Sequence, residues 1–269
     1  MSTTLPSGPL CTRDSLAADL RGLGLLEGET LLVHSSLSSL GWVCGGPGTV
    51  VQALLDVLGP EGTLVVPTHS GENSDPSLWS NPPVPEEWWA WIRASMPAYD
   101  ARTTPAFGIG VIPETARNWP GAVRSAHPQT SFAAIGPLGS AIVDGHALDC
   151  RLGERSPLAR LEEAGARILL LGADFESCTA FHLAECRADP PEVDNSFAVM
   201  TPQGRRWLTV RDSGISGERF EELGADFERE RPVVRGTVGA AGARLFPLGD
   251  AVAYARTWIT RHRPYVSES

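Results

Sequence analysis

The chain has 269 residues, of which 42% are hydrophobic and 20% charged, a composition typical of a soluble globular enzyme. Acidic residues outnumber basic ones by 32 to 22, and the net charge of −10 argues against nucleic acid as a partner while suiting a cationic small molecule. Apolar runs too short for a bilayer and an N-terminus without signal-peptide features predict a cytoplasmic protein that does not bind membranes.

The first third of the chain alternates helix and strand patterns. Helices are predicted at 12–24 and 48–59, and buried strands at 29–36 and 63–69. This alternation favours crossovers onto a parallel sheet. Residues 70–104 break the pattern, and the stretch 70–91 holds four prolines and four tryptophans. Because tryptophans at this density favour packing, we expect an ordered excursion that faces the substrate.

The rest of the chain adds further α/β elements and antiparallel strands. We expect helices at the end of 105–119 and at 156–165, 177–188, 217–231 and 250–263, strands at 130–136 and 167–173, and hairpins at 195–212 and 233–246. The prediction is a single α/β domain over residues 1–269. It has a mainly parallel central sheet flanked by helices and a C-terminal antiparallel addition at about 195–246.

The helix predicted after strand 167–173 carries a titratable pair. His182 and Glu185, in TAFHLAEC, are three residues apart and therefore share a helix face. His182 follows the carboxyl end of a strand, where open α/β sheets bind ligands. Imidazole, with an unperturbed pKa of about 6.5, suits a general base near neutral pH. A lone histidine in an apolar helix is more often a core residue, so both interpretations stay open.

Other chemistries lack their motifs. His182 and Glu185 resemble half of a metal-ligand set, but HExxH is absent, and no metal is predicted. There is no GxSxG elbow, and GWVCGGPG at 41–48 does not have the GxGxxG spacing of a dinucleotide site. That glycine stretch opens the helix 48–59, where free amides suit a phosphate or a pantetheine carbonyl. The five cysteines are scattered, which predicts free thiols.

Four blocks, in this order, resemble the aminoglycoside 3-N-acetyltransferases: HSSLSSLGWVCGGPGTVVQALLDVLGPEGTLVVPTHS, RTTPAFGIGVIPETARNWPGAVRSAHPQTSFAAIG, SPLARLEEAGARILLLG and TAFHLAE. This antibiotic N-acetyltransferase family is distinct from the GNAT superfamily. The resemblance runs over about residues 12–262. It implies acetylation of the 3-amino group of 2-deoxystreptamine aminoglycosides by acetyl-CoA, and antibiotic resistance. A biosynthetic N-acetyltransferase of another amine and a non-catalytic binding protein are the alternatives.

The resemblance also implies roles for particular residues. His182 is the expected general base, Asp212 the acid that orients it, and Glu185 a neighbour of the base or a contact of the substrate amines. The coenzyme-binding segments nominate Ser35, Ser36, Ser39, Leu40 and Gly41, then Arg124, Ser125 and His127. Glu72 and Asp75 of the excursion are expected to contact the aminoglycoside.

For the mechanism we expect direct transfer in a ternary complex. The hydroxyl of Thr179, or helix amides near residues 177–179, would then hold the oxyanion. A ping-pong route would need Cys178 as the nucleophile, although a small packing residue is the more common role for such a cysteine. The partners are small molecules, and the protein is expected to be a monomer or a homodimer.

Overall fold

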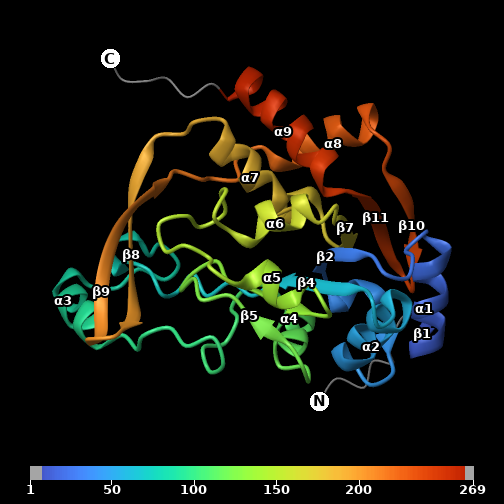
Figure 1. The fold of residues 1–269 in the computed structure, drawn as a ribbon, viewed down its shortest axis with the longest axis horizontal. Helices are drawn as coiled ribbons and strands as arrows, with labels where there is room; N and C mark the ends of the chain where they lie inside the picture. Colours follow the sequence, from blue (N-terminus) through green and yellow to red (C-terminus); the bar gives the residue numbers. More distant parts are fainter. Residues whose placement is uncertain (1–7, 264–269) are drawn as a thin grey trace.

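The centre of the molecule is a seven-stranded sheet with helices on both faces (Figure 1). The structure, a computed structural model, describes residues 8–263. The strands in spatial order are β10 (Val234–Val238), β11 (Ala241–Pro247), β7 (Arg167–Leu171), β2 (Thr30–Ser35), β4 (Thr63–Pro67), β6 (Phe132–Ile135) and β5 (Val123–Arg124). Strands β7, β2 and β4 run parallel, and the strands that extend the sheet beyond them on either side pair antiparallel.

The α/β fold with a parallel centre and late antiparallel strands is confirmed, with one difference in where those strands go. The predicted hairpin 233–246 forms β10 and β11, and β11 joins the central sheet, with Ala243 opposite Leu171 of β7. A hairpin of β8 (Glu192–Thr201) and β9 (Gly204–Ser213) forms a sheet of its own. A short parallel pair is made by β1 (Leu10–Cys11) and β3 (Trp42–Val43).

Each face of the central sheet contributes to a separate hydrophobic core. Because side chains alternate along a strand, Leu32 of β2 faces one core while Leu31 and Val33 face the other. The core of Leu32 is covered by α5 (Gly139–Val143), α6 (Pro157–Glu163), α7 (Ala180–Arg187), α8 (Phe220–Glu230) and α9 (Leu248–His262). The opposite core is covered by α1 (Arg13–Gly22), α2 (Pro47–Leu58) and α4 (Val111–Arg117).

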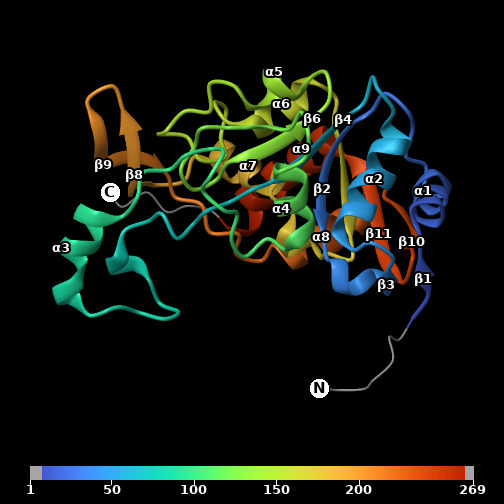
Figure 2. The ribbon, with the colours of Figure 1, turned by 90° about the horizontal axis from the view of Figure 1, so that it is seen from below.

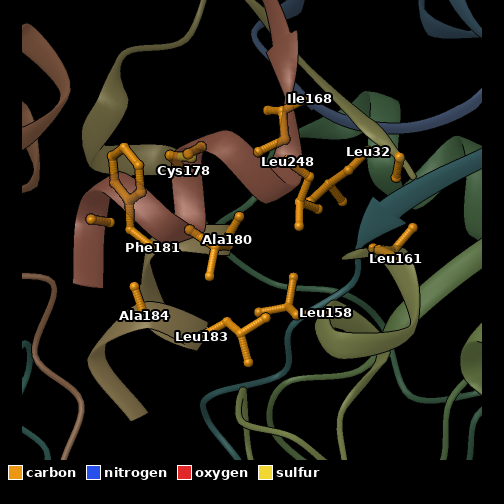
Figure 3. Close-up of a cluster of buried hydrophobic side chains, with 14 of the residues drawn as sticks. Leu32, Leu158, Leu161, Ile168, Cys178, Ala180, Phe181, Leu183, Ala184 and Leu248 are labelled. Carbon is orange, nitrogen blue, oxygen red and sulfur yellow. The ribbon is translucent and has the colours of Figure 1, made fainter. Parts of the chain in front are cut away.

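Helix α7 is fixed by the first of these cores. Phe181, Leu183 and Ala184 are fully buried there, in the same cluster as Leu158 of α6 and Ile168 of β7, and Leu183 lies beside Leu158 (Figure 3). Burial of a phenylalanine or leucine side chain stabilises a fold by about 1.5–3 kcal/mol. The apolar residues of α7 therefore set the rotation of the helix and decide where its polar residues point.

The excursion 70–104 is ordered and carries a short turn, η2 (Pro76–Leu78), and helix α3 (Glu86–Ser95). Figure 2 shows α3 away from the central sheet and beside the β8–β9 hairpin. The Asn73 side chain holds the start of the excursion to β8. Its Nδ2 donates to the Ala198 carbonyl at 2.9 Å, and its Oδ1 accepts from the Ala198 amide at 2.8 Å. Within residues 8–263, no helix is both long and apolar enough to span a bilayer.

Candidate active site

The polar pair on α7 is joined by a short hydrogen bond. His182 Nδ1 lies 2.5 Å from Glu185 Oε2. The Glu185 side chain is completely buried, whereas that of His182 keeps 21% of its surface exposed. A carboxylate can only accept hydrogen bonds, so Nδ1 carries a proton, and in the neutral ring it is Nε2 that has the lone pair. The sequence prediction that these two residues share a helix face is confirmed.

The carboxylate of Glu185 accepts from four more donors. Arg263 Nη2 donates to its Oε1 at 2.7 Å, as do the Gly217 amide at 3.2 Å and both the amide and the hydroxyl of Ser216 at 3.4 Å. Burial raises the pKa of Glu185, but the hydrogen bonds and charges of His182 and Arg263 outweigh burial, and the pKa lies below its ordinary value. Glu185 is therefore a buried anion that fixes the tautomer and the orientation of the His182 ring.

The segment between β9 and α8 packs directly against the imidazole. The rings of Phe220 and His182 are 4.8 Å apart between centroids. Gly217 has a φ of +70°, and a Cβ at this position would lie 3.4 Å from Cε1 of His182. Glycine thus suits the left-handed backbone here, and the turn brings that backbone to within van der Waals reach of the ring. Sequence analysis did not select Ser216, Gly217 or Arg263, because none belongs to a motif that names a ligand.

His182 lies in a cleft of about 1030 Å³ at the carboxyl ends of the parallel strands. His34 and Ser35 at the end of β2 and Gly172 after β7 line it, together with Thr179 in front of α7. Open α/β sheets bind ligands at this edge, so the placement predicted for His182 agrees with the observed geometry.

Two further imidazoles of the cleft, those of His34 and His69, were not selected from the sequence. Burial, and next the charge of His182, lower the pKa of each to about 3, so both rings are neutral at working pH. The signal was available, since HSS and THS both stand at the carboxyl end of a predicted strand.

Three of the five residues predicted in the HSSLSSLG segment reach the cleft. Ser35, Ser36 and Gly41 line it. Ser39 instead donates from Oγ to the Gly172 carbonyl at 3.2 Å, and Leu40 is fully buried in the core. The turn η1 (Leu37–Leu40) therefore presents one part of the segment to the cleft and anchors the other.

The RSAHP segment, predicted to contact the coenzyme, does not line the cleft that contains His182, and Arg124 instead lines a separate cavity of about 530 Å³. Ser125 and His127 are buried, and His127 Nδ1 accepts from the amides of Gln129 and Thr130, both at 3.2 Å. The guanidinium of Arg124 donates to the Thr68 carbonyl at 2.6 Å and to the Thr104 carbonyl at 2.5 Å. These polar side chains satisfy buried backbone groups, although Nε2 of His127 is buried without a hydrogen-bond partner among the described residues.

The predicted orienting contact from Asp212 to His182 is wrong. Asp212 Oδ2 accepts from the backbone amide of Arg151 at 3.0 Å and from its Nε at 2.9 Å, and Oδ1 accepts from the Ser213 amide at 2.7 Å. Asp212 lies near the end of β9 and ties that strand to the loop before α6. The acid that contacts the base is Glu185, one turn away on the same helix.

The predicted oxyanion donors differ in availability. The amides of Ser177 and Cys178 donate to Asp174 and Phe175 at 3.0 and 2.9 Å, because a short turn, η3 (Phe175–Ser177), precedes α7. These amides are therefore occupied. The Thr179 side chain lines the cleft and makes a single long contact, 3.5 Å, from Oγ1 to the Ser177 carbonyl. The Thr179 hydroxyl is therefore better placed than the amides of Ser177 and Cys178.

The acids expected to contact the substrate are also in different situations. Asp75 accepts two hydrogen bonds from Arg93, at 2.9 and 2.7 Å, and this partner lowers the pKa of Asp75 to about 2. It fastens η2 to α3 and has no carboxylate oxygen without a donor. Glu72 is exposed and lines a further cavity of about 1120 Å³.

Neither a thiol nor a metal centre emerges from the geometry. Cys178 is fully buried, and burial raises the pKa of its thiol to about 12, so it is protonated at working pH. Among the residues that the structure describes, no group of three or more His, Cys, Asp or Glu side chains could hold a metal ion.

Comparison with known proteins gives a consistent result. The family model for aminoglycoside 3-N-acetyltransferase matches residues 32–260. The SPbeta prophage-derived aminoglycoside N(3')-acetyltransferase-like protein YokD of Bacillus subtilis is 48% identical over 96% of this chain and 94% of its own. Aminoglycoside N(3)-acetyltransferase VII of Streptomyces paromomycinus is 40% identical over 94% of this chain and 92% of its own.

Solved structures show the same fold. The crystal structure of YokD superposes with a TM-score of 0.92 at 46% identity, covering 98% of this chain and 97% of that one. A structure of AAC-IIIb with CoASH superposes with a TM-score of 0.84 at 32% identity, covering 97% of this chain and 100% of that one. A structure of AAC-VIa bound to sisomicin superposes with a TM-score of 0.84 at 31% identity, covering 95% of this chain and 100% of that one.

The sheet, the cleft and these relatives define an acyltransferase. The chain belongs to the aminoglycoside 3-N-acetyltransferase family, which confirms the resemblance found in the sequence blocks.

Proposed function

We propose that this protein transfers the acetyl group of acetyl-CoA to the 3-amino group of 2-deoxystreptamine aminoglycosides and so confers resistance to them. The observation that supports this most strongly is the His182–Glu185 pair at the cleft, since an imidazole that a buried carboxylate holds through Nδ1 can act as a general base through Nε2. The aminoglycoside is the acceptor named for several relatives, and a coenzyme A is bound in one related structure.

The transfer begins when the uncharged acceptor amine attacks the thioester carbon. Nε2 of His182 takes the proton that the nitrogen loses, and Glu185 stabilises the resulting imidazolium through Nδ1. Thr179 donates a hydrogen bond to the oxyanion. When the tetrahedral intermediate collapses, the thiolate of coenzyme A leaves and recovers the proton from His182, which returns the base to its starting state.

The cleft also has groups that suit the donor. Ser35 lines the cleft, and its Oγ is hidden from solvent and has no hydrogen-bond partner within residues 8–263, so a rotation of this side chain would bring an unpaired hydroxyl to a bound thioester or pantetheine arm. Gly46, at the start of α2, and Gly41 allow close backbone approach along the same wall. No cysteine is required, since the buried Cys178 is protonated.

The decisive experiment is His182→Ala, assayed by release of free thiol from acetyl-CoA with an aminoglycoside as acceptor. We expect kcat to fall by about 10²–10⁴-fold, since a general base contributes that much, while the affinity for coenzyme A measured by calorimetry stays within about twofold. Thiol release at the wild-type rate would show that His182 is not the base. Thiol release with other amines but not with aminoglycosides would assign the enzyme to a different acceptor.

A further inference from the structure

Arg263 places a buried cation against the His182–Glu185 pair. It follows α9, and its side chain keeps 9% of its surface exposed. Nη2 donates to Glu185 Oε1 at 2.7 Å and to the Ser216 hydroxyl at 2.6 Å, and Nη1 donates to the Glu218 carbonyl at 2.8 Å. The guanidinium therefore joins the end of α9 to the carboxylate on α7 and to the segment that packs against the imidazole.

The two carboxylate oxygens of Glu185 have different principal partners. Oε1 accepts from Arg263 at 2.7 Å, from the Gly217 amide at 3.2 Å and from Ser216. Oε2 lies 2.5 Å from Nδ1 of His182. Because donors occupy Oε1, the other oxygen is left turned towards the ring. A buried carboxylate also needs a counter-ion and donors to stay ionised, so Arg263 both orients Glu185 and maintains its charge.

The charge of Arg263 also acts on proton uptake by the pair. With one proton shared between Nδ1 of His182 and Glu185, the pair carries a single negative charge, and a further proton binds at Nε2 wherever the shared proton then lies. That further proton removes the negative charge. A fixed positive charge beside the pair disfavours this step, because it stabilises the anionic form of the pair more than the neutral form.

The other ionisable groups around the pair do not supply such a charge. Burial, and next the charge of His182, lower the pKa of His34 and of His69 to about 3, and burial raises the pKa of the Cys186 thiol to about 12, so all three are uncharged near neutral pH. Water and salt screen the acids nearby, which are exposed. These are Asp174 and Glu176 at the cleft and Glu218 in the segment beside the ring. Arg263 differs from them in being both charged and buried.

We propose that Arg263 is a positioning residue of the active site, which keeps Glu185 anionic and turned towards His182 and lowers the pH at which Nε2 of His182 takes up a proton. Arg263 does not line the cleft that contains His182, so it acts on the reaction through Glu185. This role rests on the proposed function, because it concerns the base of that reaction. It adds the group that makes the base available near neutral pH.

The test follows the proton on Nε2 itself. Nitrogen NMR of isotopically labelled histidine distinguishes a protonated Nε2 from one with a lone pair, and His182→Asn identifies the signal of His182. We expect Arg263→Met, which keeps an apolar side chain but no charge, to move the midpoint of the Nε2 titration upward by about one pH unit. Arg263→Lys restores the charge, and we expect it to move the midpoint by less than half as much.

A matched variant controls for loss of stability. Arg151 likewise binds a buried carboxylate, that of Asp212, at 2.9 Å, and it donates to the Ser213 carbonyl at 2.8 Å. We expect Arg151→Met to lower Tm about as much as Arg263→Met does, but to leave the Nε2 titration unchanged. An unchanged midpoint in Arg263→Met would overturn the proposal, as would an equal shift in Arg151→Met. If Arg263→Met does not fold, Arg263→Gln, which keeps a hydrogen-bond donor, is titrated in its place with the same expectation.

Catalysis supplies a second readout. The acid limb of kcat/KM for thiol release should lie about one pH unit higher in Arg263→Met than in the wild type, and part of the lost kcat should return as the pH is raised. A loss of kcat that is equal at every pH would assign Arg263 a purely structural role and overturn the proposal. The NMR titration needs neither acetyl-CoA nor an acceptor. It therefore decides the role of Arg263 even if thiol release shows that the proposed function is wrong.

Discussion

Glu185 and Asp212 form a matched pair that tests which acid serves the base. Both carboxylates are buried, and each accepts hydrogen bonds from one arginine, Arg263 for Glu185 and Arg151 for Asp212. Replacing either by the isosteric amide weakens a hydrogen bond between charged groups, which costs about 1.5–3 kcal/mol of stability. Glu185→Gln and Asp212→Asn are therefore expected to lower Tm to a similar extent, by several degrees.

Their effects on catalysis are expected to differ. Only Glu185 contacts the imidazole, so only Glu185→Gln removes the anion that stabilises the imidazolium. We expect kcat to fall by about 10²–10⁴-fold in Glu185→Gln, equivalent to about 3–5 kcal/mol in the barrier, and to stay within about threefold in Asp212→Asn.

The assay is steady-state thiol release at saturating acetyl-CoA, at a temperature where circular dichroism shows both variants folded. If Asp212→Asn lost as much kcat as Glu185→Gln, the reasoning from the hydrogen bonds would be refuted. The same conclusion would follow if Glu185→Gln kept the wild-type kcat.

Three further outcomes follow from buried groups. Cys178→Ala should keep kcat within about twofold, since direct transfer needs no thiol, and a large loss would support an acyl-enzyme. Gly224→Ala should lower the free energy of unfolding, measured with urea, by about 1–3 kcal/mol. The new Cβ would lie 2.0 Å from Cγ of Phe175, and this clash outweighs the better helix propensity of alanine. An increase in stability would contradict the packing. Burial in the folded protein lowers the pKa of His34 and of His69 to about 3. Below about pH 6.5 these two side chains therefore bind protons in the unfolded chain but not in the folded one, which lowers the free energy of unfolding. Stability measured near pH 5 should then be lower than near pH 7 by up to about 1.4 kcal/mol per pH unit for each ring, and equal values would contradict their burial.

Much of the fold could be predicted because local patterns and the core agree. The helices predicted at 12–24 and 156–165 begin where expected, since Thr12 and Ser156 cap α1 and α6, each accepting a hydrogen bond from an amide of the first turn. The edge of the sheet was harder, because a hairpin pattern does not say what its outer strand pairs with. Strand β11 pairs with β7, which is some 70 residues earlier in the chain, and only tertiary packing decides that.

The candidate active site, too, could be predicted only in part. His182 and Glu185 could be placed together because helix geometry relates positions three apart. The roles of Asp212, Arg124 and His127 could not be predicted from the sequence. A polar residue has the same appearance there whether its side chain binds a ligand or a buried backbone group. The groups that complete the site, Arg263 above all, come from segments whose proximity to α7 no local pattern reveals.

The bond from Arg263 to Glu185 links the reaction to the far end of the chain. Arg263 follows α9 and lies 78 positions beyond the carboxylate that it holds. During synthesis, every strand of the sheet and the base itself leave the ribosome before this arginine does. The buried anion behind His182 gains its counter-ion only when α9 docks, and the same helix completes the core around Leu32, so catalytic competence is expected to appear together with that core and not before it.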